Sequence, residues 1–170
     1  MNWTPETLAR ARDSHHEAGH AVAVVARGGT LVQSSLAPAQ WSGEPAVHGA
    51  TEHQTADENR AFVTFTGPWA EARWLLENEI YGHADLAQAL AYVWRHHDSG
   101  DRIFYVNHVN QFSEHDLHGE FALTYRPWEE AWITELTPLW PAVCEVAGWL
   151  TDGQTVTHEM VEGAISRAFS

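Results

Sequence analysis

The N-terminal segment, residues 4–27, constrains the fold most because it predicts a long helix with two histidines on one face. Thr4 can cap this helix, Pro5 suits its first turn, and Gly28-Gly29 is a stop signal. Inside it, the run His16-Glu17-Ala18-Gly19-His20 sets two imidazoles four residues apart. Residues at this spacing share a helix face, so both rings can reach one ion.

The pattern H-E-x-x-H is typical of zinc hydrolases. Glu17 follows the first histidine and can hydrogen-bond a metal-bound water without ligating the metal. Zinc lowers the pKa of such a water toward ~7, and the carboxylate takes the proton as hydroxide attacks a carbonyl. We therefore predict His16 and His20 as Zn²⁺ ligands and Glu17 as the catalytic base. A glycine inside a helix costs about 1 kcal/mol relative to alanine. Its presence at position 19 therefore predicts that something packs closely against it, either the far side of the metal site or an edge strand.

Two histidines leave a catalytic zinc site one protein ligand short. Asp85 is a candidate because it opens a predicted helix, from which a carboxylate can project toward another helix. The same position suits an acid that merely satisfies free backbone N–H groups, and the residues alone leave both interpretations open. The other downstream candidates are Glu71, Glu77, Glu79 and His83.

The remaining pattern predicts an α+β fold, mostly helical, with a small β-hairpin. Strands are expected at residues 30–36 and 46–53, joined by a turn. Helices are expected at 56–79, 84–97, 127–150 and 155–169, the first of them interrupted at Gly67-Pro68 with a kink or a new start capped by Thr66. Residues 99–101 predict a break, and 102–125 give no clear pattern. We find no repeat or linker, so residues 1–170 are expected to form a single domain.

Charge and hydropathy exclude several partners. The net charge of −14 repels phosphate backbones and anionic lipid, so neither nucleic acid nor a membrane is an expected partner. No apolar stretch reaches the roughly 20 residues that span a bilayer, and the start lacks a signal-peptide pattern, which predicts a cytoplasmic protein. The single cysteine, Cys144, excludes an intrachain disulfide or a thiolate-rich zinc site.

Beyond the motif, the chain resembles the peptidase domain of the FtsH-type, membrane-anchored ATP-dependent zinc proteases. The likeness rests on the run from His16 to Ala21, on Gly49-Ala50-Thr51 in a second strand, on an Ala-Glu element at residues 70–71, and on Asp85 at a helix start. The C-terminal pattern, a long helix at 128–150 followed by a short one, is also similar. The resemblance implies a zincin-like fold, a Zn²⁺ cofactor, and Asp85 as the third zinc ligand.

The resemblance implies a zinc endopeptidase. The chain lacks the family's ATPase module and membrane segment, so we expect a stand-alone enzyme whose substrates are flexible peptides or unfolded protein segments. A separate ATPase partner has no support in the sequence, whereas a homo-oligomer is compatible with a family that forms rings. Two alternatives stay open: a catalytically inactive zinc-stabilised binding or scaffold module, and a metal-dependent hydrolase of a non-peptide amide.

Several other residues have both a functional and an ordinary interpretation. His15 is expected to pack or to support a ligand rather than bind metal. Tyr81 or His83 could stabilise an oxyanion, or could simply lie in a solvated loop. The strand at 49–51 could accept an extended peptide or be an ordinary sheet strand. One further polar group could form a second metal site or simply lie in a solvated loop. It consists of Glu114, His115, His118 and Glu120.

Overall fold

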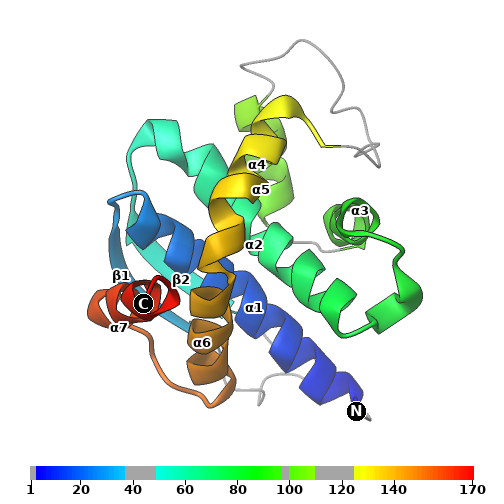
Figure 1. Cartoon of the computed structure of the whole chain (residues 1–170), viewed down its shortest axis with the longest axis horizontal. Helices are drawn as coiled ribbons and strands as arrows, with labels where there is room; N and C mark the ends of the chain where they lie inside the picture. Colours follow the sequence, from blue (N-terminus) through cyan, green and yellow to red (C-terminus); the bar gives the residue numbers. More distant parts are fainter. Residues whose placement is uncertain (1–2, 37–48, 97–99, 110–124) are drawn as a thin grey trace.

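The computed structural model describes residues 3–36, 49–96, 100–109 and 125–170, and these form a set of helices with one two-stranded antiparallel sheet at the side (Figure 1). The predicted α+β, mostly helical class is confirmed. The elements are α1 (Pro5–Ala26), β1 (Thr30–Leu36), β2 (Gly49–Gln54), α2 (Asp57–Glu77), α3 (Leu86–His96), α4 (Gly100–Val109), α5 (Pro127–Leu136), α6 (Trp140–Thr151) and α7 (His158–Ala168), with 3₁₀ turns at Ile80–Gly82 and Thr137–Leu139.

Helix α1 lies at the centre of the molecule, between α2, α6 and the sheet (Figure 1). The Thr4 hydroxyl accepts a hydrogen bond from Thr7 N (3.2 Å), which confirms the predicted N-cap. Gly19 faces the backbone of α2, and a Cβ there would lie 2.5 Å from the Thr66 carbonyl oxygen. The close contact predicted for this glycine is therefore with a second helix, and neither the metal nor the strand causes it.

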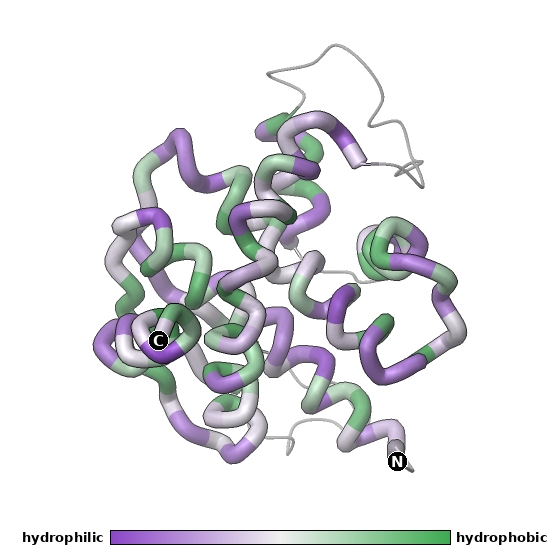
Figure 2. Tube along the Cα trace, in the orientation of Figure 1, coloured by the Kyte–Doolittle hydropathy of each residue, from purple (hydrophilic) through white to green (hydrophobic). Residues whose placement is uncertain are grey.

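Hydrophilic and hydrophobic residues alternate along most of the helices (Figure 2), whereas α1 and α2 are buried on all sides over residues 18–24 and 61–72. Apart from Asp13, His16 and His20, the buried residues of α1 have small side chains, which lets α2 and α6 approach closely. The large side chains that fill the core come from α2, α4, α5 and α6: Phe62, Phe65, Trp69, Leu75, Tyr105, Leu136 and Leu150.

The sheet positions β2 beside the C-terminal half of the molecule's central helix, where Thr51 contacts Glu17. β1 and β2 pair in an antiparallel register that joins Thr30 to Gln54 and Leu36 to Gly49, with an irregularity between Leu31 and Gln33. The first predicted strand is confirmed at its predicted bounds. The second begins at Gly49, and residues 46–48 of the predicted strand lie outside the described residues.

The prolines affect two of the predicted helices differently from the prediction. Pro68 lies inside the continuous helix α2, so the predicted new helix start is wrong. Thr66 does not cap a new helix, because its hydroxyl donates instead to the Phe62 carbonyl of the preceding turn (2.8 Å). The single helix predicted over 127–150 is wrong too: Pro138 begins a 3₁₀ turn and Pro141 lies at the start of a separate helix, α6.

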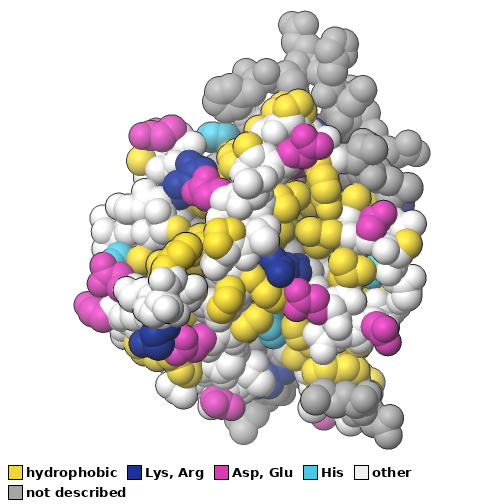
Figure 3. All heavy atoms as spheres, viewed as in Figure 1, with side chains coloured by type: hydrophobic (Ala, Val, Ile, Leu, Met, Phe, Trp, Pro, Cys, Tyr) yellow, Lys and Arg dark blue, Asp and Glu magenta, His cyan; other side chains and the backbone are white. Residues whose placement is uncertain are grey.

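The protein is acidic, and several of its arginines pair with neighbouring acids. On the face in Figure 3, basic side chains lie beside acidic ones. Ion pairs join Arg27 to Glu135 (2.6 Å) and Arg167 to Glu145 (2.7 Å). None of the helices in the described ranges combines the length and the apolar character needed to cross a membrane.

Candidate metal centre

Three potential ligand atoms converge between α1, α2 and α4. His16 Nε2 lies 2.8 Å from Asp101 Oδ2, His20 Nε2 lies 3.1 Å from the same oxygen, and the two Nε2 atoms are 3.1 Å apart. Both imidazoles are buried, and the Asp101 side chain is 25% exposed. The two histidines predicted as a ligand pair therefore do face one point, and the carboxylate beside them comes from α4.

Helix α4 holds Asp101 in place through a buried tyrosine one turn later. Tyr105 is fully buried, stacks on Trp94 of α3 at 5.0 Å, and donates its hydroxyl hydrogen to Glu129 of α5 (2.6 Å). Because Asp101 and Tyr105 are four residues apart, they share one face of α4. Anchoring the tyrosine in the core thus directs the carboxylate toward α1.

The outer nitrogen of each imidazole has an acceptor of its own. His16 Nδ1 lies 3.1 Å from Glu71 Oε2, and His20 Nδ1 lies 2.8 Å from the Val63 carbonyl oxygen. A ring that donates from Nδ1 presents a lone pair at Nε2, which is how metal-binding histidines are commonly oriented. Glu71, one of the sequence candidates for the third ligand, contacts the far side of the His16 ring and is itself buried.

The donor set fits a small divalent cation. Three electron-rich atoms at 2.8–3.1 Å repel one another unless protons or a cation lie between them. Tetrahedral zinc with bonds of about 2.0–2.1 Å requires ligand atoms about 3.3 Å apart, so the cluster needs to open by only a few tenths of an ångström. His16, His20 and Asp101 are the metal-ligand group found among the described residues.

A glycine of α2 leaves room for this cluster. A Cβ at Gly67 would lie 2.3 Å from His20 Nε2 and 2.9 Å from His16 Nε2. Only a residue without a side chain can stand this close to the two ligand atoms. Gly67 was predicted as a helix breaker, whereas in the structure it is a helical residue that makes space for the candidate metal centre.

Hydrogen bonds and charges within the cluster outweigh the effect of burial on the pKa values of its three members. Burial lowers the pKa of His16, but hydrogen bonds and charges from Asp101 and Glu71 outweigh it and raise that pKa to about 10. Burial likewise lowers the pKa of His20, but the charge of Asp101, its hydrogen bond to the ring and the charge of Glu17 together raise that pKa more. Burial favours the neutral Asp101 carboxyl, yet the charges of His20 and His16 hold its pKa well below the usual range. Without a cation, protons thus hold this cluster together.

These shifts predict how the metal-free protein responds to pH. The His16 pKa is raised from 6.5, so its contribution to stability is complete below pH 6.5 and is lost as the pH rises toward 10. The Asp101 pKa is lowered from 3.8, so its contribution is present above that pH and is lost only on acidification. With chelator present, we expect the free energy of unfolding to fall above pH 6.5, by at most about 1.4 kcal/mol per pH unit for this proton.

Chemical denaturation of the wild type and Asp101→Asn at several pH values measures this effect. The amide carries no negative charge and cannot raise the pKa of His16 as strongly, so the variant should lose less stability between pH 6.5 and 10. Parallel curves for the two proteins would show that the carboxylate does not hold the imidazole proton.

Glu17 follows His16 on α1, and its side chain is held by the sheet. Its Oε2 accepts a hydrogen bond from the Thr51 hydroxyl of β2 (2.6 Å), and a Cβ at Gly49 would lie 2.2 Å from Glu17 Cγ. The Glu17 charge also helps to raise the pKa of His20. The Gly-x-Thr element at residues 49–51 therefore positions the predicted base, one residue by leaving space and the other by a hydrogen bond.

Asp85 lies elsewhere in the fold. It is exposed, precedes α3, and accepts a hydrogen bond from Gln88 N (2.8 Å), which is the helix-capping interpretation of this residue. The structure does not bring it together with His16 and His20. It brings Asp101 to them instead, from a segment predicted as a break between helices, where Gly100 begins α4.

The remaining residues singled out in the sequence do not join the candidate metal centre in the described part of the chain. His15 packs on Trp74 at a ring distance of 5.3 Å, as expected for a structural histidine. Tyr81 and His83 form an aromatic group with Tyr92, and no contact connects either residue to the candidate metal centre in the described part of the chain. The polar group predicted at residues 114–120 lies outside the described residues.

Comparisons with protein-family models, with curated proteins and with solved structures each found no match. The resemblance to FtsH-type proteases stays a prediction from the sequence. Any functional conclusion has to come from the geometry of the candidate metal centre itself.

Proposed function

We propose that the protein is a zinc-dependent hydrolase that cleaves peptide bonds in flexible peptides or unfolded segments. One observation carries the proposal: two imidazole nitrogens and a carboxylate oxygen converge within 3.1 Å, next to a glutamate fixed by the neighbouring strand. Three protein ligands with an open position are typical of catalytic zinc, whereas structural sites have four. Three such ligands converge in the part of the chain that the structure describes, and this number favours an enzyme over a scaffold module.

Each residue has a defined role in the proposed reaction. His16, His20 and Asp101 hold Zn²⁺, which supplies Lewis acidity toward the scissile carbonyl and acidifies water. Glu17 accepts a proton from the attacking water and can return it to the leaving amine. Thr51 keeps the Glu17 carboxylate oriented by its 2.6 Å hydrogen bond. Glu71 and the Val63 carbonyl fix the ring orientation of the two imidazoles.

The test of this proposal combines metal analysis with peptide digestion. We expect the purified protein to contain about one zinc per chain and to cleave members of an unstructured peptide library. A chelator should stop cleavage, and added Zn²⁺ should restore it. A zinc-loaded protein that cleaves no peptide but hydrolyses small amides would favour the non-peptide alternative, and one inert toward both would favour the scaffold.

Alanine substitutions at two aspartates separate the third ligand from the helix cap. Asp101→Ala should lower zinc affinity by more than the roughly 10–100-fold that loss of a supporting partner costs. Asp85→Ala should leave zinc affinity unchanged and cost about 0.5–2 kcal/mol of stability, because it removes an N-cap hydrogen bond. Competition with a fluorescent chelator measures the affinities. The reverse pattern, with affinity lost at Asp85 alone, would restore the ligand predicted from the sequence.

A further inference from the structure

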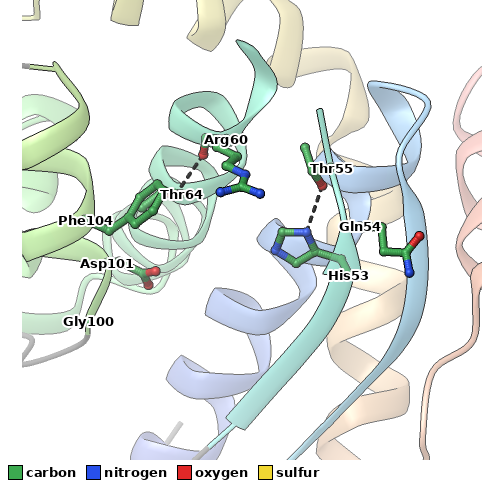
Figure 4. Close-up of a pocket in the computed structure, with 8 residues that line it drawn as sticks. All are labelled: His53, Gln54, Thr55, Arg60, Thr64, Gly100, Asp101 and Phe104. Carbon is green, nitrogen blue, oxygen red and sulfur yellow. Dashed lines mark hydrogen bonds between the residues drawn. The ribbon is translucent and has the colours of Figure 1, made fainter. Parts of the chain in front are cut away.

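A pocket of about 600 Å³ opens beside the candidate metal centre, between β2 on one side and α2 and α4 on the other (Figure 4). Asp101 belongs to its wall, so the pocket and the candidate centre share a residue. Its volume lies in the range that suits a small ligand or one or two side chains of a peptide. The residues that line it are His53, Gln54, Thr55, Arg60, Thr64, Gly100, Asp101 and Phe104.

Arg60 is the one cation among the described residues that line this pocket, in a protein whose net charge is −14. Arg60 pairs through Nε with Asp57 at 3.1 Å, and that partner is 85% exposed, so solvent screens the pair. The guanidinium group lies toward the open space between α2 and β2 in Figure 4. A guanidinium carries five N–H donors, so one contact through Nε leaves its two terminal nitrogens able to bind a carboxylate in a bidentate fashion.

The histidine across the pocket adds a polar group without adding charge. His53 Nδ1 lies 2.8 Å from the Thr55 hydroxyl oxygen, and the ring projects from β2 into the pocket (Figure 4). Partial burial and the charges of His20 and Arg60 lower its pKa. At neutral pH the positive charge of the pocket therefore comes from Arg60.

The pocket also has an apolar surface. Phe104 is 40% exposed and lines the pocket from α4, three residues after Asp101. An aliphatic stem can pack on this ring while its charged end reaches the guanidinium. The charge of Arg60 and the apolar ring of Phe104 together orient an acidic group toward the guanidinium.

We propose that this pocket selects substrates by a carboxylate group close to the scissile bond, bound by Arg60 with its aliphatic stem on Phe104. The carboxylate is either an acidic side chain or the C-terminus of the peptide. The proposal rests on the proposed function, because it takes the occupant of the pocket to be part of the substrate. Recognition of an anion nevertheless depends on Arg60 and requires no turnover, so it can be measured separately.

The binding test uses four small probes and the full-length protein as purified. N-acetylglutamate α-amide is compared with N-acetylglutamine α-amide, and N-acetylalanine with its amide, by NMR titration. We expect one charged probe to bind ~5- to 30-fold more tightly than its neutral partner, as a charge-assisted hydrogen bond would give. The probe pair with the larger ratio identifies the source of the carboxylate.

Two charge-matched variants test whether Arg60 is responsible. Arg60→Gln should abolish the preference for the charged probe, whereas Arg95→Gln, an exposed arginine of α3 outside the pocket, should retain it. A carboxylate bound directly to the metal would persist in both variants. The absence of any charge preference in the wild type, or an equal loss in both variants, would overturn the proposal.

Digestion of paired peptides connects the pocket to cleavage. Peptides that differ only in Glu or Gln beside the cleaved bond, or in a free or amidated C-terminus, should differ ~5- to 30-fold in kcat/KM, and Arg60→Gln should remove that difference. If no peptide is cleaved, the proposed function fails, and the probe titration alone decides whether the pocket binds carboxylates.

Discussion

Glu17→Gln is expected to keep zinc and to lower kcat/KM for peptide hydrolysis by roughly 10²–10⁴-fold, the usual contribution of general base catalysis. The amide has the same shape and can still accept a hydrogen bond from Thr51, so the strand and helix should stay in place. What it lacks is the basic oxygen that takes the proton from water. None of the three candidate ligands changes, which is why metal content should not fall.

The control for this variant is Glu52→Gln. Glu52 is an exposed residue of β2 next to Thr51, so its substitution makes the same change in net charge without altering the candidate centre. Cleavage of one fluorogenic peptide and zinc content are measured for both variants and the wild type. Wild-type rates in Glu17→Gln would remove this residue from the mechanism, and loss of zinc in it would make Glu17 a ligand instead of a base.

Gly67→Ala should damage the candidate metal centre more than its small size suggests. The new Cβ would lie 2.3 Å from His20 Nε2, and this ring cannot retreat without breaking its hydrogen bond to the Val63 carbonyl oxygen. Overpacking of this kind costs about 1–3 kcal/mol, and the better helix propensity of alanine returns about 1 kcal/mol. We therefore expect a folded protein of slightly lower stability whose zinc affinity falls by more than about 100-fold.

The matched control is Gly148→Ala in α6. A Cβ at Gly148 meets nothing within 4 Å, so alanine there should leave zinc affinity unchanged and raise stability by up to about 1 kcal/mol. Circular dichroism on heating reports the fold, and chelator competition reports the affinity. Wild-type zinc affinity in Gly67→Ala would show that the bound ion does not lie between the two imidazoles at this face of α2.

Local signals in the sequence were sufficient for the element that carries the histidines. Thr4 and Pro5 begin α1, Gly28 follows its end, and the spacing of His16 and His20 decides which helix face both rings share. The first strand was predicted for the same reason, since its β-prone run is bounded by turn residues. In each case the conformation is determined by residues within a few positions of one another.

The third candidate ligand could not be found in this way. Asp85 and Asp101 each stand at or near the start of a helix with similar sequence signals, and only tertiary packing distinguishes them. The decisive contact is the burial of Tyr105 against Trp94 and Glu129, which turns one face of α4 toward α1. A helical spacing between Asp101 and Tyr105 was present in the sequence, but nothing local indicated which elements the tyrosine would meet.

The prolines show the same division between local and tertiary effects. Pro68 was predicted to interrupt a helix, yet packing of α2 against α1 maintains the helix through it. At Pro138 and Pro141 the helix does break, well inside the predicted range of 127–150. Local propensity is decisive where packing does not oppose it, and α2 is the element on which α1 packs most closely.

Diffraction data collected on both sides of the zinc absorption edge test the central claim most directly. In crystals of the protein purified without chelator, we expect one anomalous peak about 2.0–2.2 Å from His16 Nε2, His20 Nε2 and an Asp101 carboxylate oxygen, with the remaining position open toward Glu17. An ion bound elsewhere, an Asp101 side chain turned away from the peak, or a fourth protein ligand closing the site would contradict the assignment of a catalytic zinc centre.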